Sequence, residues 1–203
     1  LGHLKRALAM EGDSKRKADL HRRIASIHER KSDYETSREE CDKGIAMIVG
    51  SDAIELARLH NARGWTHLRT GEYEPARKDF IKALEISERL GDRKEISYSH
   101  HSLGTVSLYV EDYTSAIANL EKALDIRTHI GDDAGVSKSL NNLGMVHSEM
   151  GNFDLALDAY NKSHELMKKI GEKGSLASLA VNIGGIYSDL GDVDSAMRFT
   201  KEG

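Results

Sequence analysis

The sequence has very few cysteines, prolines and aromatic residues. Its 203 residues include one cysteine, one proline and three phenylalanines. Because Cys41 has no second thiol to pair with, an internal disulfide is excluded, and we expect a small buried side chain in a reducing, cytoplasmic compartment. With 39% hydrophobic and 31% charged residues, the composition suits amphipathic helices better than a β-sheet.

An excess of positive charge and a long apolar run are also missing. The formal net charge is −4, and binding to phosphate backbones requires a basic footprint, so we expect no nucleic acid partner. The apolar run at 44–50 falls short of the ~18 residues that cross a bilayer, so we expect no membrane segment. The first residues, LGHLKRALAM, lack an initiator methionine and read as half of an amphipathic helix, which indicates a piece of a longer protein.

Motifs for catalysis, metal binding and phosphate binding are absent from the sequence. There is no H-E-x-x-H, no paired C-x-x-C and no EF-hand loop for a metal ion. There is no G-x-x-x-x-G-K-[ST] loop for phosphate, and no G-x-S-x-G turn that would expose a nucleophile. We therefore expect a protein that is not an enzyme and that needs no metal or cofactor.

What the sequence does have is an internal repeat. Four glycines stand 40 residues apart, at Gly64, Gly104, Gly144 and Gly184. Small residues follow each of them at fixed distances, 12 and 19 residues later: Ala76, Ala116, Ala156, Ala196, and Ala83, Ala123, Ser163. Bulky residues follow 9 and 16 residues later: Tyr73, Tyr113, Phe153, Val193, and Phe80, Leu120, Tyr160. Small positions facing bulky ones predict pairs of closely packed helices with a buried apolar stripe.

Glycines also mark where the helices end. Gly91, Gly131 and Gly171 close the second helix of each unit, and Gly71, Gly151 and Gly191 close the first, as left-handed residues at helix ends do. Glu111 takes the place of such a glycine, which predicts either a slightly strained turn or a turn that closes differently in that unit. Pro75 falls in a first helical turn, where its missing N–H costs little.

The spacing predicts an all-α, right-handed α-solenoid of antiparallel helix pairs, with one array over residues 1–203. Residues 1–11 are expected to form part of a second helix. Complete repeats are expected at 15–50, 54–91, 94–131 and 134–171, and a shortened repeat at 174–203. Histidines recur at equivalent places in neighbouring units, so we interpret them as repeat positions and not as converging metal ligands: His60 and His100, and His67 and His147.

The pattern resembles the tetratricopeptide repeat. Ala76 to Phe80 and Ala156 to Tyr160 match its A-x3-F step, and Leu103-Gly104, Leu143-Gly144 and Ile183-Gly184 match its L-G step. The signature tryptophan is replaced by His60, His100 or Leu140, and the late proline by Glu88, Thr128 or Lys168. Units of this length resemble the long-repeat subclass of spindle-orientation adaptors, kinesin light chains and MalT-like regulators. The resemblance implies that a peptide or partner domain binds in a concave groove.

By the same resemblance, the first helix of each unit lines the groove. The implied groove residues are Arg22, Arg30, Arg58, Asn61, Trp65, Arg69, Tyr98, His101, Tyr109, Lys138, Asn141 and Met145. The asparagines suit a peptide backbone, the cations a carboxylate and the aromatics an apolar anchor, so the expected partner has acidic and apolar residues. The alternative is a solvated polar face, with one of the aromatics packed in the core.

Three functions remain open at this point. The leading hypothesis is a protein-interaction scaffold or adaptor, the repeat region of a larger regulatory or signalling protein. The second is a self-associating assembly or sensor module, a homo-oligomer formed through apolar ends of the array. The third is the regulatory portion of an enzyme whose catalytic domain lies outside this chain.

Overall fold

Helices make up all the regular structure of the described chain, as the sequence predicts. The computed structural model describes residues 1–202, and the side chains of all of these except 173–175 and 200–202. The helices are α1 (Gly2–Met10), α2 (Ser14–Arg30), α3 (Tyr34–Ile48), α4 (Ile54–Arg69), α5 (Tyr73–Leu90), α6 (Arg93–Tyr109), α7 (Tyr113–His129), α8 (Asp133–Glu149), α9 (Phe153–Ile170), α10 (Lys173–Asp189) and α11 (Val193–Glu202).

Aspartates begin many of these helices. The side chains of Asp33, Asp92 and Asp132 each accept a hydrogen bond from the backbone N–H three residues later. This bond satisfies a donor that a helix start otherwise leaves without a partner. The aspartates that follow Gly91 and Gly131 are therefore helix caps, whereas the side chains of Glu72, Asn152 and Glu172, which follow Gly71, Gly151 and Gly171, make no such bond.

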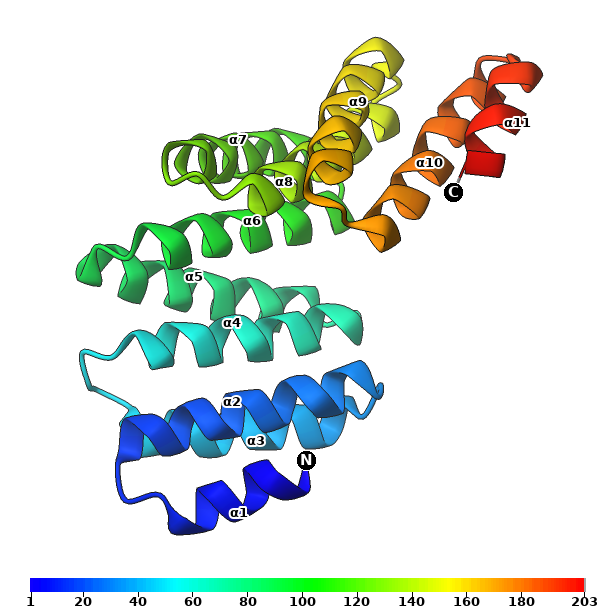
Figure 1. Cartoon of the computed structure of the whole chain (residues 1–203). Coiled ribbons are helices and arrows are strands. Elements are labelled where there is room, and N and C mark those ends of the chain that lie inside the picture. Colours follow the sequence, from blue (N-terminus) through cyan, green and yellow to red (C-terminus); the bar gives the residue numbers. More distant parts are fainter. Residues whose placement is uncertain (203) are drawn as a thin grey trace. The chain divides into compact units, whose positions relative to one another are not determined.

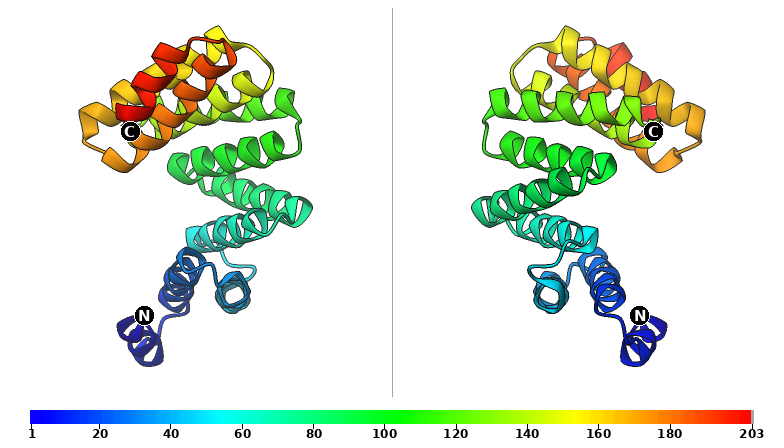
Figure 2. Two further views of the ribbon diagram at one scale, coloured as in Figure 1. Left: turned by 90° about the vertical axis from the view of Figure 1, so that its right-hand side faces the viewer. Right: turned by 90° about the vertical axis from the view of Figure 1, so that its left-hand side faces the viewer.

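The chain divides into two compact units, Leu1–Val110 and the residues from Glu111 onward. In the first unit α2 packs on α3 and α4 on α5, and the first helices of successive pairs, α2, α4 and α6, also contact one another (Figure 1). Figure 2 shows the helices of this unit, coloured blue to green, from two sides. In the second unit α8 packs on α9 and α10 on α11, and α8 contacts α10. The single array over residues 1–203 stays a prediction, and residue 203 lies outside the described residues.

The small residues of the repeat are buried where helices touch. Ala76, Ala116 and Ala156 are fully covered, as are Ala83, Ala123 and Ser163. A Cβ at Gly64 would lie 2.5 Å from Cε1 of Phe80, and one at Gly144 would lie 2.6 Å from Cδ1 of Tyr160. The aromatic ring sixteen residues later therefore fills the space that a side chain at each glycine would need. This confirms the predicted packing of small positions against bulky ones.

One bulky position differs from the expectation. Val193 was expected to be a packed residue, but 63% of it is exposed. It is the first residue of α11. The buried thiol, by contrast, is as expected: Cys41 is fully covered, and burial raises the pKa of its thiol to about 12, so it stays protonated and unreactive at neutral pH.

We predict that Gly64→Ala and Gly144→Ala each lower the free energy of unfolding by about 1–3 kcal/mol, because the added methyl group overlaps a buried ring. Gly185→Ala is the matched control. It changes a glycine in the middle of α10 whose added Cβ meets nothing within 4 Å, so stability should rise by about 0.5–1 kcal/mol through helix propensity alone. Urea unfolding followed by circular dichroism measures all three; equal effects at the three sites would contradict this packing.

The turn after each first helix contains one left-handed residue. Three are glycines, with φ of 77° at Gly71, 74° at Gly151 and 78° at Gly191. The equivalent places in the other two repeats hold Ser32 with φ 58° and Glu111 with φ 60°. Residues other than glycine rarely adopt this conformation. Of the two alternatives expected at Glu111, its backbone has the strained one, and Ser32 shares it.

We predict that Ser32→Gly and Glu111→Gly each raise the free energy of unfolding by about 0.5–1 kcal/mol, because glycine adopts this φ without steric cost. The reverse change, Gly151→Ala, should lower it by about 1 kcal/mol. Thermal and urea unfolding of the three variants test this, and a loss of stability in both glycine variants would show that the turns are not strained.

Candidate functional site

The residues implied to line the groove lie on the first helices of the repeats. In the first unit they fall on α2 (Arg22, Arg30), α4 (Arg58, Asn61, Trp65, Arg69) and α6 (Tyr98, His101, Tyr109). In the second unit they fall on α8 (Lys138, Asn141, Met145). These residues differ widely in burial and in what they contact, so each group is considered in turn.

Three of them meet in one pocket of the first unit. Trp65, Arg69 and Tyr109 line a pocket of about 280 Å³ together with Leu68, Gly71 and Tyr73. The chain path explains this meeting. The short turn at Gly71 brings the last turn of α4 beside the first turn of α5, and α6 runs antiparallel to α5, so its last residue reaches the same end.

Aromatic rings form the walls of this pocket. Tyr73 and Tyr109 stack with ring centroids 6.0 Å apart and planes 16° apart. Trp65 meets Phe80 edge to face at 5.8 Å. The indole Nε1 is covered from solvent and has no hydrogen-bond acceptor among the described residues, so Trp65 contributes apolar carbon surface and no accessible donor to the pocket.

Two of the candidate arginines are held by carboxylates of the protein itself. Arg22 lies 2.7 Å from Asp19, and Nε of Arg58 donates to Glu95 of α6 at 2.8 Å. Burial of the Arg58 guanidinium lowers its pKa, but the hydrogen bond and charge of Glu95 outweigh this and raise the pKa overall. Arg58 thus joins α4 to α6, and little of its charge remains for a partner.

Arg30 and Arg69 face solvent instead. Nε of Arg30 donates to the backbone oxygen of Ser26, and no carboxylate lies within ion-pair distance of it among the described residues. Arg69 is 57% exposed, and its one ion contact within the described part of the chain is Glu29, at 3.9 Å. These two guanidinium groups can therefore bind a carboxylate of a partner.

Asn61 and His101 are buried. Asn61 is only 2% exposed, and its Nδ2 donates to Oγ of Ser99 on α6 at 3.1 Å. His101 lies among covered side chains of α6. Asn61 therefore joins two helices and has no surface for a peptide backbone, in contrast to Tyr98, which remains partly exposed on the same helix.

In the second unit, the candidate residues of α8 differ in exposure and in their contacts. Lys138 is exposed, and Oδ1 of Asn141 accepts a hydrogen bond from Asn182 of α10 at 3.3 Å. Nδ2 of Asn141 lies 3.7 Å from the sulfur of Met145, which packs against the apolar core of this unit. Of these three, Lys138 is the residue most open to a partner.

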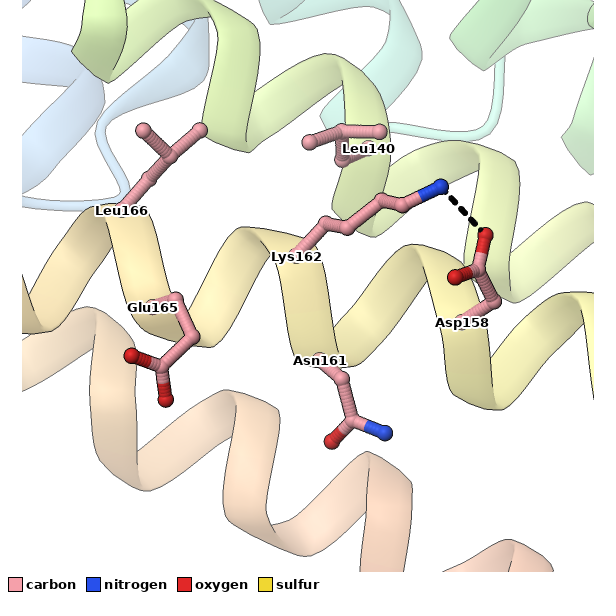
Figure 3. A pocket seen from close by; sticks show the side chains of 6 residues that line it. All are labelled: Leu140, Asp158, Asn161, Lys162, Glu165 and Leu166. Carbon is pink, nitrogen blue, oxygen red and sulfur yellow. Dashed lines mark hydrogen bonds and ion pairs between the residues drawn. The ribbon is translucent and has the colours of Figure 1, made fainter.

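Sequence reasoning missed a second, wider pocket on α9. About 540 Å³ in volume, it is lined by Leu140 of α8 and by Asp158, Asn161, Lys162, Glu165 and Leu166 of α9 (Figure 3). Nζ of Lys162 bonds Asp158 at 2.7 Å, and Asn161 and Glu165 extend from α9 on the side away from Leu140 (Figure 3). The signal was Leu140, which stands where the family signature has tryptophan and leaves part of this surface apolar.

The described residues offer neither a metal site nor a membrane span. Nowhere do three His, Cys, Asp or Glu side chains gather so that they could hold a metal ion. Of the described helices, none combines the length and the apolar character that a bilayer span requires.

The family model of the tetratricopeptide repeat matches four overlapping stretches, at residues 16–89, 69–129, 95–169 and 135–202. The chain belongs to the tetratricopeptide repeat family. Together the stretches run from residue 16 to residue 202, so the family resemblance read from the L-G and A-x3-F steps is confirmed. None of the curated proteins matches the sequence.

Solved structures share the fold of this tetratricopeptide repeat chain at low sequence identity. BtubC (BKLC) from P. vanneervenii has a TM-score of 0.79 at 16% identity, over 93% of this chain and 78% of its own. A Rap protein complexed with Competence and Sporulation Factor has 0.81 at 14%, over 98% and 67%. The Rap conjugation gene regulator of plasmid pLS20, in complex with the Phr* peptide, has 0.77 at 17%, over 90% and 51%. They confirm the fold class, an α-solenoid of antiparallel helix pairs.

Histidine–carboxylate pairs join the helices within the first two tetratricopeptide repeats. His21 bonds Glu40 at 2.8 Å, and His60 bonds Asp79 at 2.8 Å, in each case across the helix pair. At the turn between the helices, His28 bonds Asp33 at 2.7 Å and His67 bonds Glu72 at 3.1 Å. These histidines hold the repeats together, and the signal that would have found the pairs is the recurrence of an acid 19 or 5 residues after each histidine.

Asp79 is the centre of the largest of these polar clusters. Its buried carboxylate receives Nε of Arg63 at 2.8 Å and Nη2 at 2.6 Å, and Arg63 also reaches Asp42 of α3 at 2.5 Å. Burial raises the pKa of Asp79, but the hydrogen bonds from Arg63 and His60 outweigh it and hold the pKa below its usual value. The cluster therefore joins α3, α4 and α5.

We predict that stability falls with acidification. The folded state lowers the pKa values of Asp79 and Glu40, so both contribute stability above the unfolded carboxyl pKa of about 4, and lose it as the pH falls below that value through their folded pKa values. The free energy of unfolding, measured by urea titration, should fall between about pH 5 and about pH 3.

Asp79→Asn should cost on the order of 3 kcal/mol at neutral pH, because it leaves Arg63 without its main partner, and it should flatten the pH dependence. Asp158→Asn, which breaks an exposed pair with Lys162, is the control and should cost less than about 1 kcal/mol. The same pH dependence in wild type and Asp79→Asn would contradict the role of Asp79.

Proposed function

We propose that the chain is a non-catalytic interaction scaffold that binds an extended segment of a partner protein along the first helices of its repeats. Two of the similar structures support this proposal, since one holds the Phr* peptide and the other Competence and Sporulation Factor. The observation that carries it for this chain is the pocket at Trp65, Arg69 and Tyr109, where a guanidinium and exposed aromatic carbon lie side by side. Arginine and large aromatics are the residues that contribute most to protein interfaces.

The proposed contact surface consists of the candidate residues whose side chains reach solvent. They are Arg30, Trp65, Arg69, Tyr98 and Tyr109 in the first unit, and Lys138 and Asn141 in the second. Asn61, His101, Arg22 and Arg58 are left out, because their polar groups are buried or bound within the protein. The remaining surface is cationic and aromatic, which suits a partner with acidic and apolar residues.

A non-catalytic role agrees with the state of the reactive side chains. Burial keeps the Cys41 thiol protonated, so it is no nucleophile at neutral pH. His60 and His67 are bound to carboxylates that also bind arginines, so these histidines have a packing role. The unpaired Cys41 further supports a reducing, cytoplasmic site of action.

The proposal predicts that the chain selects peptides from a random-sequence library. Arg30→Glu should weaken the binding of peptides that contact the first unit about tenfold, equal to about 1.4 kcal/mol, and Lys138→Glu should do the same for peptides that contact the second unit. The loss should shrink at high salt, since these charges are exposed. Isothermal titration calorimetry with the selected peptides measures it. The matched controls are Lys78→Glu and Lys122→Glu, exposed cations on the second helices α5 and α7. If the controls weaken binding as much as the two variants, the contact surface is elsewhere.

Self-association is the second candidate, and one feature of the second unit favours it. Val181 on α10, Leu190 directly after α10, and Val193 and Met197 on α11 are each more than half exposed. Several large apolar side chains exposed on two paired helices favour an apolar contact with a second copy of the chain. Sedimentation velocity over a range of concentrations tests this, because Met197→Glu should abolish any dimer; a monomer at all concentrations would remove this candidate.

A further inference from the structure

The pocket lies between the last turns of α4 and α6 and the first turn of α5, and it can hold a large side chain. Its volume of about 280 Å³ is at the lower end of the range of about 300–1,000 Å³ that small-molecule sites occupy. Its walls are the carbon surfaces of Trp65 and Leu68 and the stacked rings of Tyr73 and Tyr109. An apolar side chain of a peptide matches this lining, because it would cover the half-exposed ring of Tyr109.

The walls are already in position before a ligand arrives. Leu68 and Phe80 are buried in the core of this unit, and Trp65 and Tyr73 pack against that core. Stacking against Tyr73 holds the ring of Tyr109. A pocket whose side chains are fixed loses little conformational entropy on binding, which favours it as an anchor point.

The charge at the rim of the pocket is positive. Arg69 is 57% exposed, and Glu29 lies 3.9 Å from its Nε, too far for a hydrogen bond. The acidic residue of the neighbouring turn does not compete for Arg69, because Glu72 is bound by Arg38, His67 and Thr70. The guanidinium can therefore bind a carboxylate with two parallel hydrogen bonds.

The backbone at the turn excludes one source of that carboxylate. Capture of a peptide's C-terminal carboxylate uses a group of backbone N–H donors. Here the N–H of Gly71 donates to Leu68 at 3.1 Å and that of Glu72 donates to His67 at 2.9 Å, so both are already bonded within the turn. The carboxylate that fits is that of an aspartate or glutamate side chain.

We infer that this pocket selects an internal acidic–apolar pair in the partner peptide. A large apolar side chain sits between Trp65 and Tyr109, and the carboxylate of an adjacent aspartate or glutamate binds Arg69. This inference rests on the proposed function, since it names what one part of the contact surface recognises. Binding at this pocket requires no change in the repeats, because its walls belong to the folded core.

The test is a selection of random-sequence peptides on the full chain, followed by titration of the selected peptides. Wild type should enrich peptides with an aspartate or glutamate beside a large apolar residue. Arg69→Glu should replace the acidic preference with a preference for lysine or arginine, and Tyr109→Ala should remove the apolar preference while Tyr109→Phe keeps it. The matched control is Arg89→Glu, because Arg89 is 58% exposed and lies at the far end of α5.

A double-mutant cycle then tests the contact itself. Arg69→Gln should weaken a selected peptide about tenfold, aspartate to asparagine in the peptide should do the same, and the two changes together should cost no more than one of them. Trp65 is the only tryptophan of the chain, so its fluorescence emission should shift when the wild-type peptide binds.

The outcomes separate this inference from the proposed function. If wild type enriches no peptide, both fail. If it enriches peptides that respond to Lys138→Glu but not to changes at Arg69 or Tyr109, the scaffold stands and the pocket inference is overturned. Additive losses in the cycle, or unchanged tryptophan emission on binding, would also overturn it.

Discussion

The close approach of two helices at a glycine is the constraint on which the first unit depends. The ring of Phe80 occupies the space that a Cβ at position 64 would need, so α4 and α5 can pack at this distance only with glycine there. Phe80 in turn meets the edge of Trp65, whose carbon surface lines the pocket. The position of the pocket wall thus follows from a packing rule of the core. Gly144 and Tyr160 repeat the same contact in the second unit.

Polar pairs supplement this apolar contact and limit what the surface can offer. Ser37 bonds Thr66 at 3.1 Å, and Ser137 bonds Ser163 at 2.7 Å, both buried between helices. Such pairs penalise a shift between helices, because a shift would leave buried polar groups without partners. Pairing within the protein continues nearer the surface, where Glu95 binds the guanidinium of Arg58. Among the candidate groove residues, exposed charge is therefore confined to Arg30, Arg69 and Lys138, of which Arg69 lines a pocket.

The repeat could be read from the sequence because its constraints recur at fixed spacing. Each repeated glycine and alanine packs against a residue of the same unit. Small residues such as Gly64 and Ala76 therefore predict a bulky partner such as Phe80 at a fixed distance along the sequence. The state of the surface residues could not be read in this way. Asn61 is buried because Ser99 of the following repeat receives its amide, and Arg58 is bound because Glu95 faces it. Val193 was expected to be packed but is exposed. An apolar stripe in the sequence predicts which face of a helix is apolar, but not which element covers that face.

Specificity in a repeat protein must come from positions where the units differ, because whatever recurs in every unit serves the packing. Two positions of the repeat are counted from Gly64, Gly104, Gly144 and Gly184, and from Ala25, which takes the glycine's place in the first repeat. Both hold a different residue in each unit. Directly after the glycine stand Ser26, Trp65, Thr105, Met145 and Gly185, and five residues after it stand Arg30, Arg69, Tyr109, Glu149 and Asp189. Only the second repeat places tryptophan at the former and arginine at the latter. Its neighbour supplies Tyr109 from the end of α6, so one pocket draws on two successive repeats. A peptide bound there has its register set at that one repeat, since no other unit of the chain carries the same pair of residues.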